Sequence, residues 1–249
     1  MNRLFGRSLL LTIFISFQAC AQIETKEEEN VEVDVTANYE IPAENIYPSS
    51  DIIITTHSDW AKKHYPKRIQ EFKQNPLQTD DIVFLGNSIT EQVEDWGQKV
   101  NNAKAKNRGI AGDTTEGVLA RLEELIYFKP AKAFILIGIN DLFRDDMSAQ
   151  KVYDNIIRIV RRINTNNPET KIYLHTILPT TTSSLKSKIK QTNSLLIKAE
   201  KVESYKLIRL YKEFSNENDT MNMSLSSDGV HLNNNGYEVW IKKIKEYIN

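Results

Sequence analysis

The sequence predicts an α/β protein, a three-layer α/β/α sandwich built around a parallel sheet. Short apolar runs, each about the length of one buried strand, alternate along the 249 residues with segments of helical periodicity. Strands that are apolar on both faces and are each followed by a helix favour parallel pairing, because helices then cover both faces of the sheet. The connections between such strands are right-handed. The pattern does not define the order of the strands.

The chain begins with a segment typical of an export signal. Residues 1–7 carry two arginines, residues 8–17 are almost wholly apolar, and small residues surround Cys20. We predict an export signal over residues 1–21, because ten apolar residues are too few to span a bilayer. The signal could be cleaved after Ala21, or Cys20 could be lipidated as in bacterial lipoproteins, which would attach the protein to a membrane. Either way we expect a periplasmic or cell-envelope-anchored protein of a bacterium.

Residues 22–50 are acidic and poor in large apolar side chains, and residues 27–29 are three consecutive glutamates. A segment of this composition cannot bury enough surface to offset the entropy lost on ordering. We therefore predict a flexible linker here, followed by one compact domain over residues 51–249.

The domain begins with a helix and then alternates strands and helices. A helix that packs on the outside of the sandwich is predicted by four large side chains: Trp60, Tyr65, Ile69 and Phe72. Five apolar runs predict the strands: residues 82–85, 105–110, 133–137, 171–175 and 207–210. Apolar side chains at helical spacing predict the later helices: Val118, Leu122, Leu125 and Ile126; Val152, Ile156, Ile159, Val160 and Ile163; Ile189, Leu195, Leu196 and Val202; and Tyr237, Trp240, Ile241, Ile244 and Ile248.

The composition argues against several classes of partner. Removing Arg3 and Arg7 with the signal leaves 30 basic residues against 33 acidic ones, and no basic patch interleaved with aromatic residues indicates nucleic-acid binding. Cys20 is the only cysteine, so no disulfide is expected in the mature chain. The histidines are scattered and form no metal-ligand pattern. We expect neither a metal nor a cofactor.

Polar residues follow the first three predicted strands. Ser88 follows the first strand within the sequence GNSIT, a glycine-containing loop over residues 109–115 follows the second, and Asn140 follows the third. Because open α/β sheets bind ligands at the carboxyl ends of their strands, these residues are candidates for a shared site. Each motif also has an ordinary interpretation when it is taken alone. Ser88 could cap a helix, and the other two segments could be simple turns.

A fourth motif, with Asp228 and His231, lies just before the last helix. This spacing allows one loop to aim both side chains at the same point, with Asp228 accepting a hydrogen bond from the ring Nδ1. A histidine held in one tautomer by a carboxylate is what a serine nucleophile requires. Alternatively, His231 is an incidental histidine in a surface loop. His57 and His64 lie in the N-terminal helical region, and His175 lies in an apolar strand, where we expect a core histidine with satisfied hydrogen bonds.

In their order along the chain, these four motifs resemble the four signature blocks of the SGNH (GDSL-type) esterase and lipase superfamily. They span residues 86–231, and the surrounding strand and helix pattern extends the resemblance to most of the chain after Trp60. The resemblance implies a flavodoxin-like sheet of five parallel strands in the order 2-1-3-4-5. In that order the first and third strands are neighbours, and a crevice opens between their carboxyl ends.

The resemblance also implies a role for each motif. It makes Ser88 the nucleophile, His231 the general base and then acid, and Asp228 the group that orients His231. It assigns the oxyanion hole to the backbone N–H groups of Ser88 and Gly112 and to the side-chain amide of Asn140.

This chain departs from the superfamily at Asn87, where Asp is usual. Asparagine is nearly isosteric with aspartate but neutral, so any charge-assisted hydrogen bond from this position is weaker. We expect the fold to tolerate Asn87, because its side chain can still accept hydrogen bonds from backbone N–H groups.

The sequence thus predicts an exported serine esterase that hydrolyses short acyl esters, acetyl above all, on carbohydrates, through an acyl-serine intermediate. Residues 142–144, 180–184 and 216–227 are candidate lining segments, and none forms a long apolar lid suited to a fatty chain. Three alternatives stay open: a lysophospholipase or thioesterase of the same fold, a catalytically silent glycan-binding module, and a nucleotide-binding domain. The last gives no role to Asp228 and His231.

Overall fold

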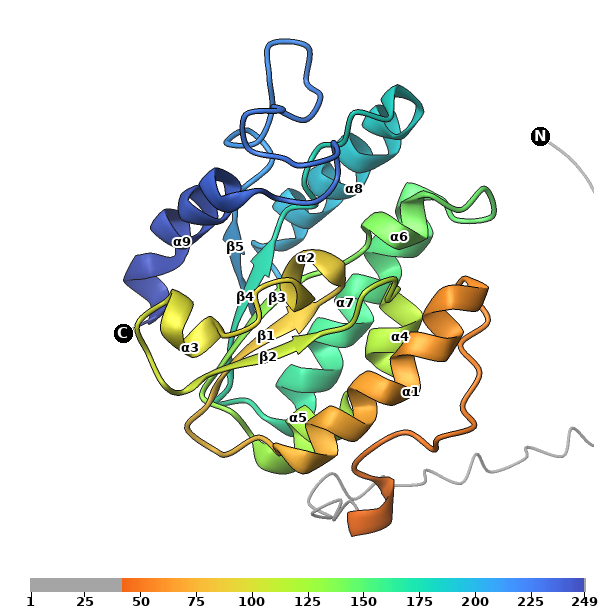
Figure 1. Ribbon diagram of the computed structural model, residues 1–249, viewed down its shortest axis with the longest axis vertical. Helices are drawn as coiled ribbons and strands as arrows, with labels where there is room; N and C mark the ends of the chain where they lie inside the picture. The colour runs from red at the N-terminus through yellow and green to blue at the C-terminus, as the bar shows by residue number, and fades with distance from the viewer. Residues whose placement is uncertain (1–41, 249) are drawn as a thin grey trace, which may run out of the picture. The chain divides into compact units, whose positions relative to one another are not determined.

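The computed structural model describes residues 42–248, and its centre is a sheet of five strands in the order β2-β1-β3-β4-β5 (Figure 1). Every pair of neighbouring strands is parallel, so the predicted strand order and direction are confirmed. The strands are β1 Ile82–Gly86, β2 Ala105–Gly109, β3 Lys132–Leu136, β4 Lys171–His175 and β5 Lys206–Ile208. Gly86 is in register with Gly109 on one side and Leu136 on the other, so these three strands end at one edge.

Helices connect the strands, close to the predicted positions. Their bounds are α1 Asp59–Gln74, α2 Ser88–Glu91, α3 Trp96–Lys99, α4 Thr115–Leu119, α5 Glu123–Phe128, α6 Ile139–Leu142, α7 Ala149–Asn166, α8 Lys186–Ala199 and α9 Asn234–Ile248, with 3-10 turns at Ala43–Asn45 and Ser183–Leu185. Two details differ from the prediction. The apolar face expected around residues 118–126 is divided between α4 and α5, and Val202 is 83% exposed, beyond the end of α8.

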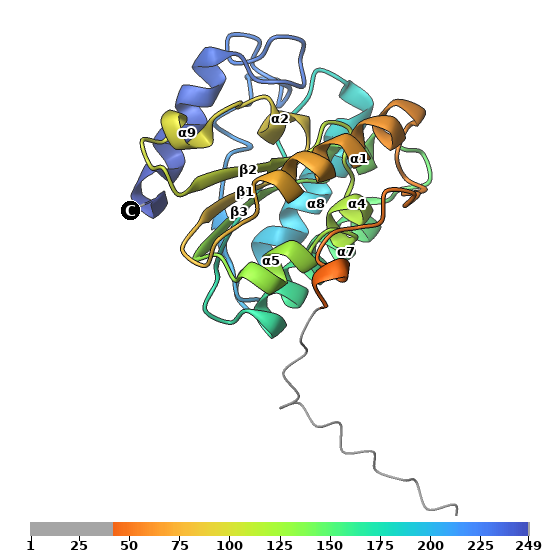
Figure 2. The same cartoon turned by 60° about the horizontal axis from the view of Figure 1, so that its bottom comes forward.

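Successive side chains of each strand point to opposite faces of the sheet, so a hydrophobic core forms on each face. Val83 and Leu85 point into a cluster that α4, α5, α7 and α8 cover, whereas Ile82 and Phe84 point into a second cluster under α3 and α9. Figure 2 shows these helices on opposite sides of the strands. The predicted three-layer sandwich is therefore confirmed. In the second cluster the ring of Phe84 stacks on Trp96, with 3.7 Å between ring centroids.

Helix α1 lies beside β2, the edge strand, and closes that side of the domain (Figure 1). Its buried stripe consists of Ala61, Tyr65, Ile69 and Phe72. These residues recur every three or four positions, and they pack with Ile110, which directly follows β2. Trp60 is outside this stripe and 59% exposed, so the prediction that it packs against the sandwich is wrong.

The N-terminal segments are only partly described. The predicted export signal over residues 1–21, including Cys20, lies outside the described residues, as does most of the predicted linker. Within residues 42–50, Ile46 is 7% exposed in the core, and the Tyr47 hydroxyl donates to Glu124 at 3.1 Å. The packed domain therefore begins before residue 51, because Ile46 and Tyr47 already contact the core. Across residues 42–248, no helix combines the length and apolar character needed to cross a membrane.

Candidate active site

The serine of the first motif stands in the turn between β1 and α2. Asn87 precedes α2 as its N-cap, and its Oδ1 accepts a hydrogen bond from the backbone N–H of Ile89 at 3.1 Å. The expectation that Asn87 accepts from the backbone is therefore confirmed. Since Asn87 caps the helix, the capping interpretation of Ser88 is wrong. The Ser88 hydroxyl is left available for a different partner.

That partner is His231, 143 residues further along the chain. Ser88 Oγ lies 2.9 Å from His231 Nε2, and His231 Nδ1 lies 2.7 Å from Asp228 Oδ2. The other carboxylate oxygen of Asp228 accepts from the backbone N–H groups of Val230 at 2.9 Å and His231 at 2.8 Å. The structure thus brings the three residues predicted for the triad into one hydrogen-bonded chain at the carboxyl edge of the sheet.

The charge of Asp228 determines the direction of these hydrogen bonds. Partial burial acts to raise the pKa of Asp228, but hydrogen bonds from the His231 ring and from two backbone N–H groups outweigh it and lower the pKa to about 2. An ionised Asp228 accepts the Nδ1 proton of His231, so Nε2 of that ring faces the Ser88 hydroxyl as an acceptor.

Neighbouring loops hold the segment that carries Asp228 and His231. Ser226 Oγ donates to the His231 carbonyl at 2.6 Å, and Thr181 N–H donates to the Gly229 carbonyl at 3.0 Å. Gly229 has a φ of +90°, and a Cβ added to it would lie 2.1 Å from Thr181 Oγ1, so a larger residue does not fit. Two of the predicted lining segments, residues 180–184 and 216–227, are therefore in contact with the site loop.

The candidate oxyanion donors Gly112 and Asn140 follow the ends of β2 and β3. Gly112 adopts a φ of +78° in the loop after β2, a conformation that favours glycine. Asn140 lies in the first turn of α6, and its Nδ2 donates to the Asp113 carbonyl at 2.8 Å, which leaves the second amide hydrogen free to donate elsewhere. Among the described residues, the backbone N–H groups of Ser88 and Gly112 have no protein acceptor.

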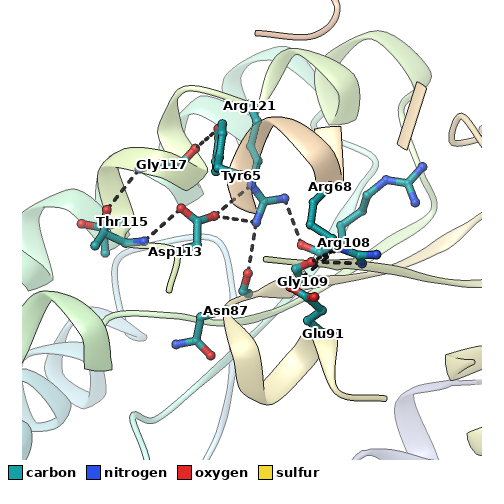
Figure 3. Close-up of polar contacts among 12 residues, drawn as sticks. Tyr65, Arg68, Asn87, Glu91, Arg108, Gly109, Asp113, Thr115, Gly117 and Arg121 are labelled. Carbon is teal, nitrogen blue, oxygen red and sulfur yellow. Dashed lines mark hydrogen bonds and ion pairs between the residues drawn. The ribbon is translucent and has the colours of Figure 1, made fainter. Parts of the chain in front are cut away.

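A buried ion pair behind the Gly112 loop was not anticipated from the sequence (Figure 3). Asp113 is fully buried and accepts from Arg121 at 2.9 Å and from His57 Nε2 at 2.9 Å. Arg121 also donates to the carbonyls of Gly86 at 3.1 Å and Arg108 at 2.9 Å. Arg121 therefore ties the ends of β1 and β2 to the loop. No periodic pattern in the sequence relates these residues, so sequence reasoning had no signal for them.

Glu91 forms a second connection that sequence reasoning missed. It ends α2, and its carboxylate accepts from the backbone N–H of Ala111 and from His64 Nε2 at 2.9 Å. Arg68 of α1 lies 3.7 Å from the same carboxylate. The helix that begins with Ser88 is thereby joined both to the loop after β2 and to α1.

The remaining histidine has a structural role. Nδ1 of His175 donates to the Ile135 carbonyl at 2.9 Å, and Trp240 Nε1 donates to its Nε2 at 3.1 Å. Burial lowers the pKa of His175 to about 4, so the ring is neutral at physiological pH. The prediction of a satisfied core histidine is confirmed. Within residues 42–248, no group of three or more His, Cys, Asp or Glu side chains is placed to hold a metal ion.

The fold and the hydrogen-bonded Ser, His and Asp define a class of protein: a hydrolase with a three-layer α/β/α fold and a serine arranged for acyl transfer. The chain belongs to the GDSL-like lipase/acylhydrolase family, whose model matches residues 84–239. This confirms the predicted SGNH (GDSL-type) resemblance, and the protein is a carboxylic ester hydrolase.

One relative is similar in sequence, and two solved structures are similar in fold. The platelet-activating factor acetylhydrolase IB subunit alpha2 of Rattus norvegicus is 31% identical over 176 residues, which cover 68% of this chain and 76% of that protein. A GDSL-like lipase from Bacteroides thetaiotaomicron has the same fold, with a TM-score of 0.65 at 24% identity, and covers 76% of this chain and 98% of its own. The acetyl xylan esterase AlAXEase matches with a TM-score of 0.57 at 19% identity, covering 68% of this chain and 100% of its own.

Proposed function

We propose that this hydrolase is an exported serine esterase that removes short acyl groups, acetyl above all, from carbohydrates. The observation that carries the chemistry is the position of His231, whose ring contacts Ser88 through one nitrogen and Asp228 through the other. A serine hydroxyl is a weak nucleophile at neutral pH unless an adjacent base takes its proton. His231 is the only described histidine in contact with Ser88, and Asp228 holds it in the required tautomer.

In the first half of the proposed reaction, His231 Nε2 takes the Ser88 proton as Oγ attacks the ester carbonyl. The oxyanion that forms accepts hydrogen bonds from the backbone N–H groups of Ser88 and Gly112 and from Asn140 Nδ2. His231 then returns the proton to the departing alcohol, which leaves an acyl group on Ser88. In the second half, His231 removes a proton from water, the hydroxide attacks the acyl-serine, and the proton returns to Ser88 as the acid is released.

The size of the apolar space beside the site supports a short acyl group. A cavity of about 10 Å³ is lined mostly by apolar side chains, with Asn87 and Thr180 as its polar lining residues. Three of the apolar residues, Ile89, Ile139 and Val230, each adjoin a proposed reactive residue in sequence. A space of this size admits roughly one methyl-sized or water-sized group. Two similar proteins have acetyl esters in their names, platelet-activating factor acetylhydrolase and acetyl xylan esterase, which also supports acetyl as the acyl group.

The role of Ser88 is tested by covalent labelling together with turnover. A fluorophosphonate probe is expected to modify Ser88, as mass spectrometry of the labelled peptide will report, and Ser88→Ala is expected to lose several orders of magnitude in kcat. The fold of the variant should be unchanged, because the hydroxyl bonds only the histidine. An unlabelled Ser88 in the folded protein would indicate a silent binding module instead.

The acyl preference is tested with esters that share one alcohol. We expect p-nitrophenyl acetate to be hydrolysed with a much higher kcat/KM than the octanoate, since the cavity admits about one methyl group. A strong preference for octanoate would instead support a lysophospholipase or thioesterase. Acetate release from a panel of acetylated glycans, with Ser88→Ala as the control, then identifies the sugar.

Export is proposed from the basic and apolar pattern of residues 1–21. Expression of the full chain in a bacterium, followed by fractionation and mass spectrometry of the N-terminal peptide, tests it. Cleavage after Ala21 would leave a free N-terminus, whereas lipidation would leave a diacylated Cys20 that Cys20→Ser removes. A full-length chain retained in the cytoplasm would contradict both forms of the proposal.

A further inference from the structure

Trp60 is the exposed tryptophan of this protein, and it lies beside the proposed oxyanion loop. It is 59% exposed, whereas Trp96 and Trp240 are each 1% exposed. A Cβ added to Gly112 would lie 3.7 Å from Cζ3 of the Trp60 ring and 2.8 Å from Cβ of Ala61. The start of α1 therefore contacts the glycine whose N–H is proposed to bind the oxyanion. A large apolar ring is thus exposed at the edge of the reaction site.

The Trp60 ring is held in place by contacts that lead back to the nucleophile helix. It stacks on the ring of His64, with 4.7 Å between centroids and 23° between planes. His64 Nε2 in turn bonds both carboxylate oxygens of Glu91, at 2.9 and 3.0 Å. Glu91 ends the short helix that begins with Ser88. The orientation of the indole is therefore set before any substrate arrives, which reduces the entropy lost on binding.

We propose that Trp60 is the platform on which the sugar ring of the ester substrate stacks. This inference rests on the proposed esterase function and names the residue that binds the alcohol part of the ester. The cavity proposed for the acyl group is lined by the start of α2, the end of β3, residues 177–180 after β4, and Val230. Trp60 comes instead from α1, beside β2, and does not line it. The two parts of an ester bound at Ser88 would therefore extend in different directions. An indole face suits the apolar C–H face of a pyranose, which it removes from water.

Kinetics on two acetate esters test the platform. Tetra-acetylated xylopyranose carries a ring, and ethyl acetate does not. For Trp60→Ala we expect KM for the sugar ester to rise roughly tenfold, in line with the loss of about 60 Å² of apolar contact. The ratio of kcat/KM for the sugar ester to that for ethyl acetate should fall by a similar factor. Trp60→Phe, which keeps a smaller ring, should restore part of the ratio.

Tyr127→Ala is the matched control. Tyr127 is an aromatic side chain of similar exposure, 46%, on α5. That helix ends just before β3 begins, at the opposite end of the sheet from Ser88 (Figure 1). Its replacement should leave the ratio for the two esters unchanged.

Direct binding gives a readout that needs no turnover. Because the other two tryptophans are buried, a change of indole fluorescence on sugar binding reports Trp60. In Ser88→Ala, titration with tetra-acetylated xylopyranose should shift the emission to shorter wavelength. The same titration of Ser88→Ala/Trp60→Phe should give no shift.

The possible outcomes separate this inference from the function on which it rests. A loss specific to the sugar ester, together with the fluorescence shift, supports the platform. Equal losses on both esters, no loss on either, or a wild-type protein that hydrolyses ethyl acetate but not the sugar ester would each overturn it. Failure of the esterase function itself would appear differently, as a wild-type protein that hydrolyses neither ester and leaves Ser88 unlabelled by fluorophosphonate.

Discussion

The hydroxyl of Ser88 is available to His231 because Asn87, rather than Ser88, caps the N-terminus of α2. Asn87 supplies the cap through its Oδ1, and it is 1% exposed beneath the turn. Its departure from the usual Asp of the family removes a charge but retains the acceptor. The neighbouring residues Asn140 and Asp141 also have different hydrogen-bond partners. The Asn140 amide donates to the Asp113 carbonyl, whereas Asp141 is fully buried and accepts from Thr115.

Replacing Asn140 with alanine tests the oxyanion hole at this scale. We expect Asn140→Ala to lower kcat by about 10² to 10³, because a donor aimed at the developing oxyanion stabilises the transition state more than the bound ester. KM for p-nitrophenyl acetate should change much less. Steady-state kinetics provide the measurement, and fluorophosphonate labelling of Ser88 confirms an intact nucleophile. A variant with unchanged kcat would remove Asn140 from the proposed mechanism.

Asp141 should make the stability of the protein depend on pH. Burial raises its pKa from 3.8 to about 6, although hydrogen bonds from Thr115 act in the opposite direction. Between these values the folded state holds more protons than the unfolded state, so its contribution to stability is full at low pH and is lost as the pH rises through about 6. We expect the difference in unfolding free energy between wild type and Asp141→Asn to change by about 2 kcal/mol between pH 4 and 7.

Urea denaturation at a series of pH values measures this difference directly. Asparagine keeps the shape and one acceptor oxygen, so the hydrogen bond from Thr115 has a counterpart in the variant. Parallel pH curves for the two proteins would show that folding does not raise the pKa of Asp141.

At the scale of elements, the site depends on how three strand ends and α1 are connected. Arg121 donates hydrogen bonds to the last residue of β1, to β2 and to Asp113, in the loop after β2 that also contains Gly112 (Figure 3). Glu91 connects α2 to this loop, called here the Asp113 loop, and to α1. Arg108 of β2 and Glu124 of α5 form another buried ion pair, with 2.7 Å between Nη2 and Oε1. That pair does not contact the Asp113 loop.

These two ion pairs form a matched comparison. Arg121→Met/Asp113→Asn and Arg108→Met/Glu124→Gln each remove one buried pair and should both lower Tm, because several hydrogen bonds of the arginines are lost. Only the Arg121 variant should lower kcat, by about tenfold, since displacement of the loop moves Gly112 away from the oxyanion.

Both kinetic assays are made at a temperature well below either Tm, so that only folded protein is compared. An equal fall of kcat in the two variants would mean that burial of charge near β2, rather than contact with the Asp113 loop, matters for turnover.

At the scale of the whole molecule, the strands belong to two core clusters at once. Each strand sends alternate side chains into opposite clusters, so neither layer of helices can leave without exposing the sheet. Phe84 occupies the centre of one cluster, fully buried, and stacks on both Trp96 and Phe134. Residues 42–248 are therefore expected to unfold as one cooperative unit.

Phe84→Ala tests this cooperativity. The substitution should lower the free energy of unfolding by about 3–5 kcal/mol, the usual cost of removing a buried phenylalanine. Urea unfolding followed by the fluorescence of the buried tryptophans and by esterase activity should still give coincident transitions. Separate transitions would show that the two faces of the sheet unfold independently.

The sequence predicts the sheet and the reactive residues well because both depend on local patterns. Ser88 and Asn140 closely follow strands, and His231 lies in the loop between β5 and α9, so the parallel topology places all three on the carboxyl side of the sheet. The supporting residues could not be predicted in this way, since Glu91 and Arg121 meet their partners only after helices pack. Trp60 was misplaced because Ala61, a weaker hydrophobic signal, takes the buried position of α1.

The order of Ser88 and His231 along the chain means that the ribosome adds them at different times. A growing polypeptide contains Ser88 long before it contains His231, 143 residues later. Until the segment before α9 has been made and has packed near the carboxyl ends of the strands, Ser88 lacks its proposed base. We therefore expect a chain in synthesis, or one shortened before residue 231, to be inert toward esters. We expect hydrolysis to begin only once the domain is complete, so a nascent chain would leave cellular esters intact.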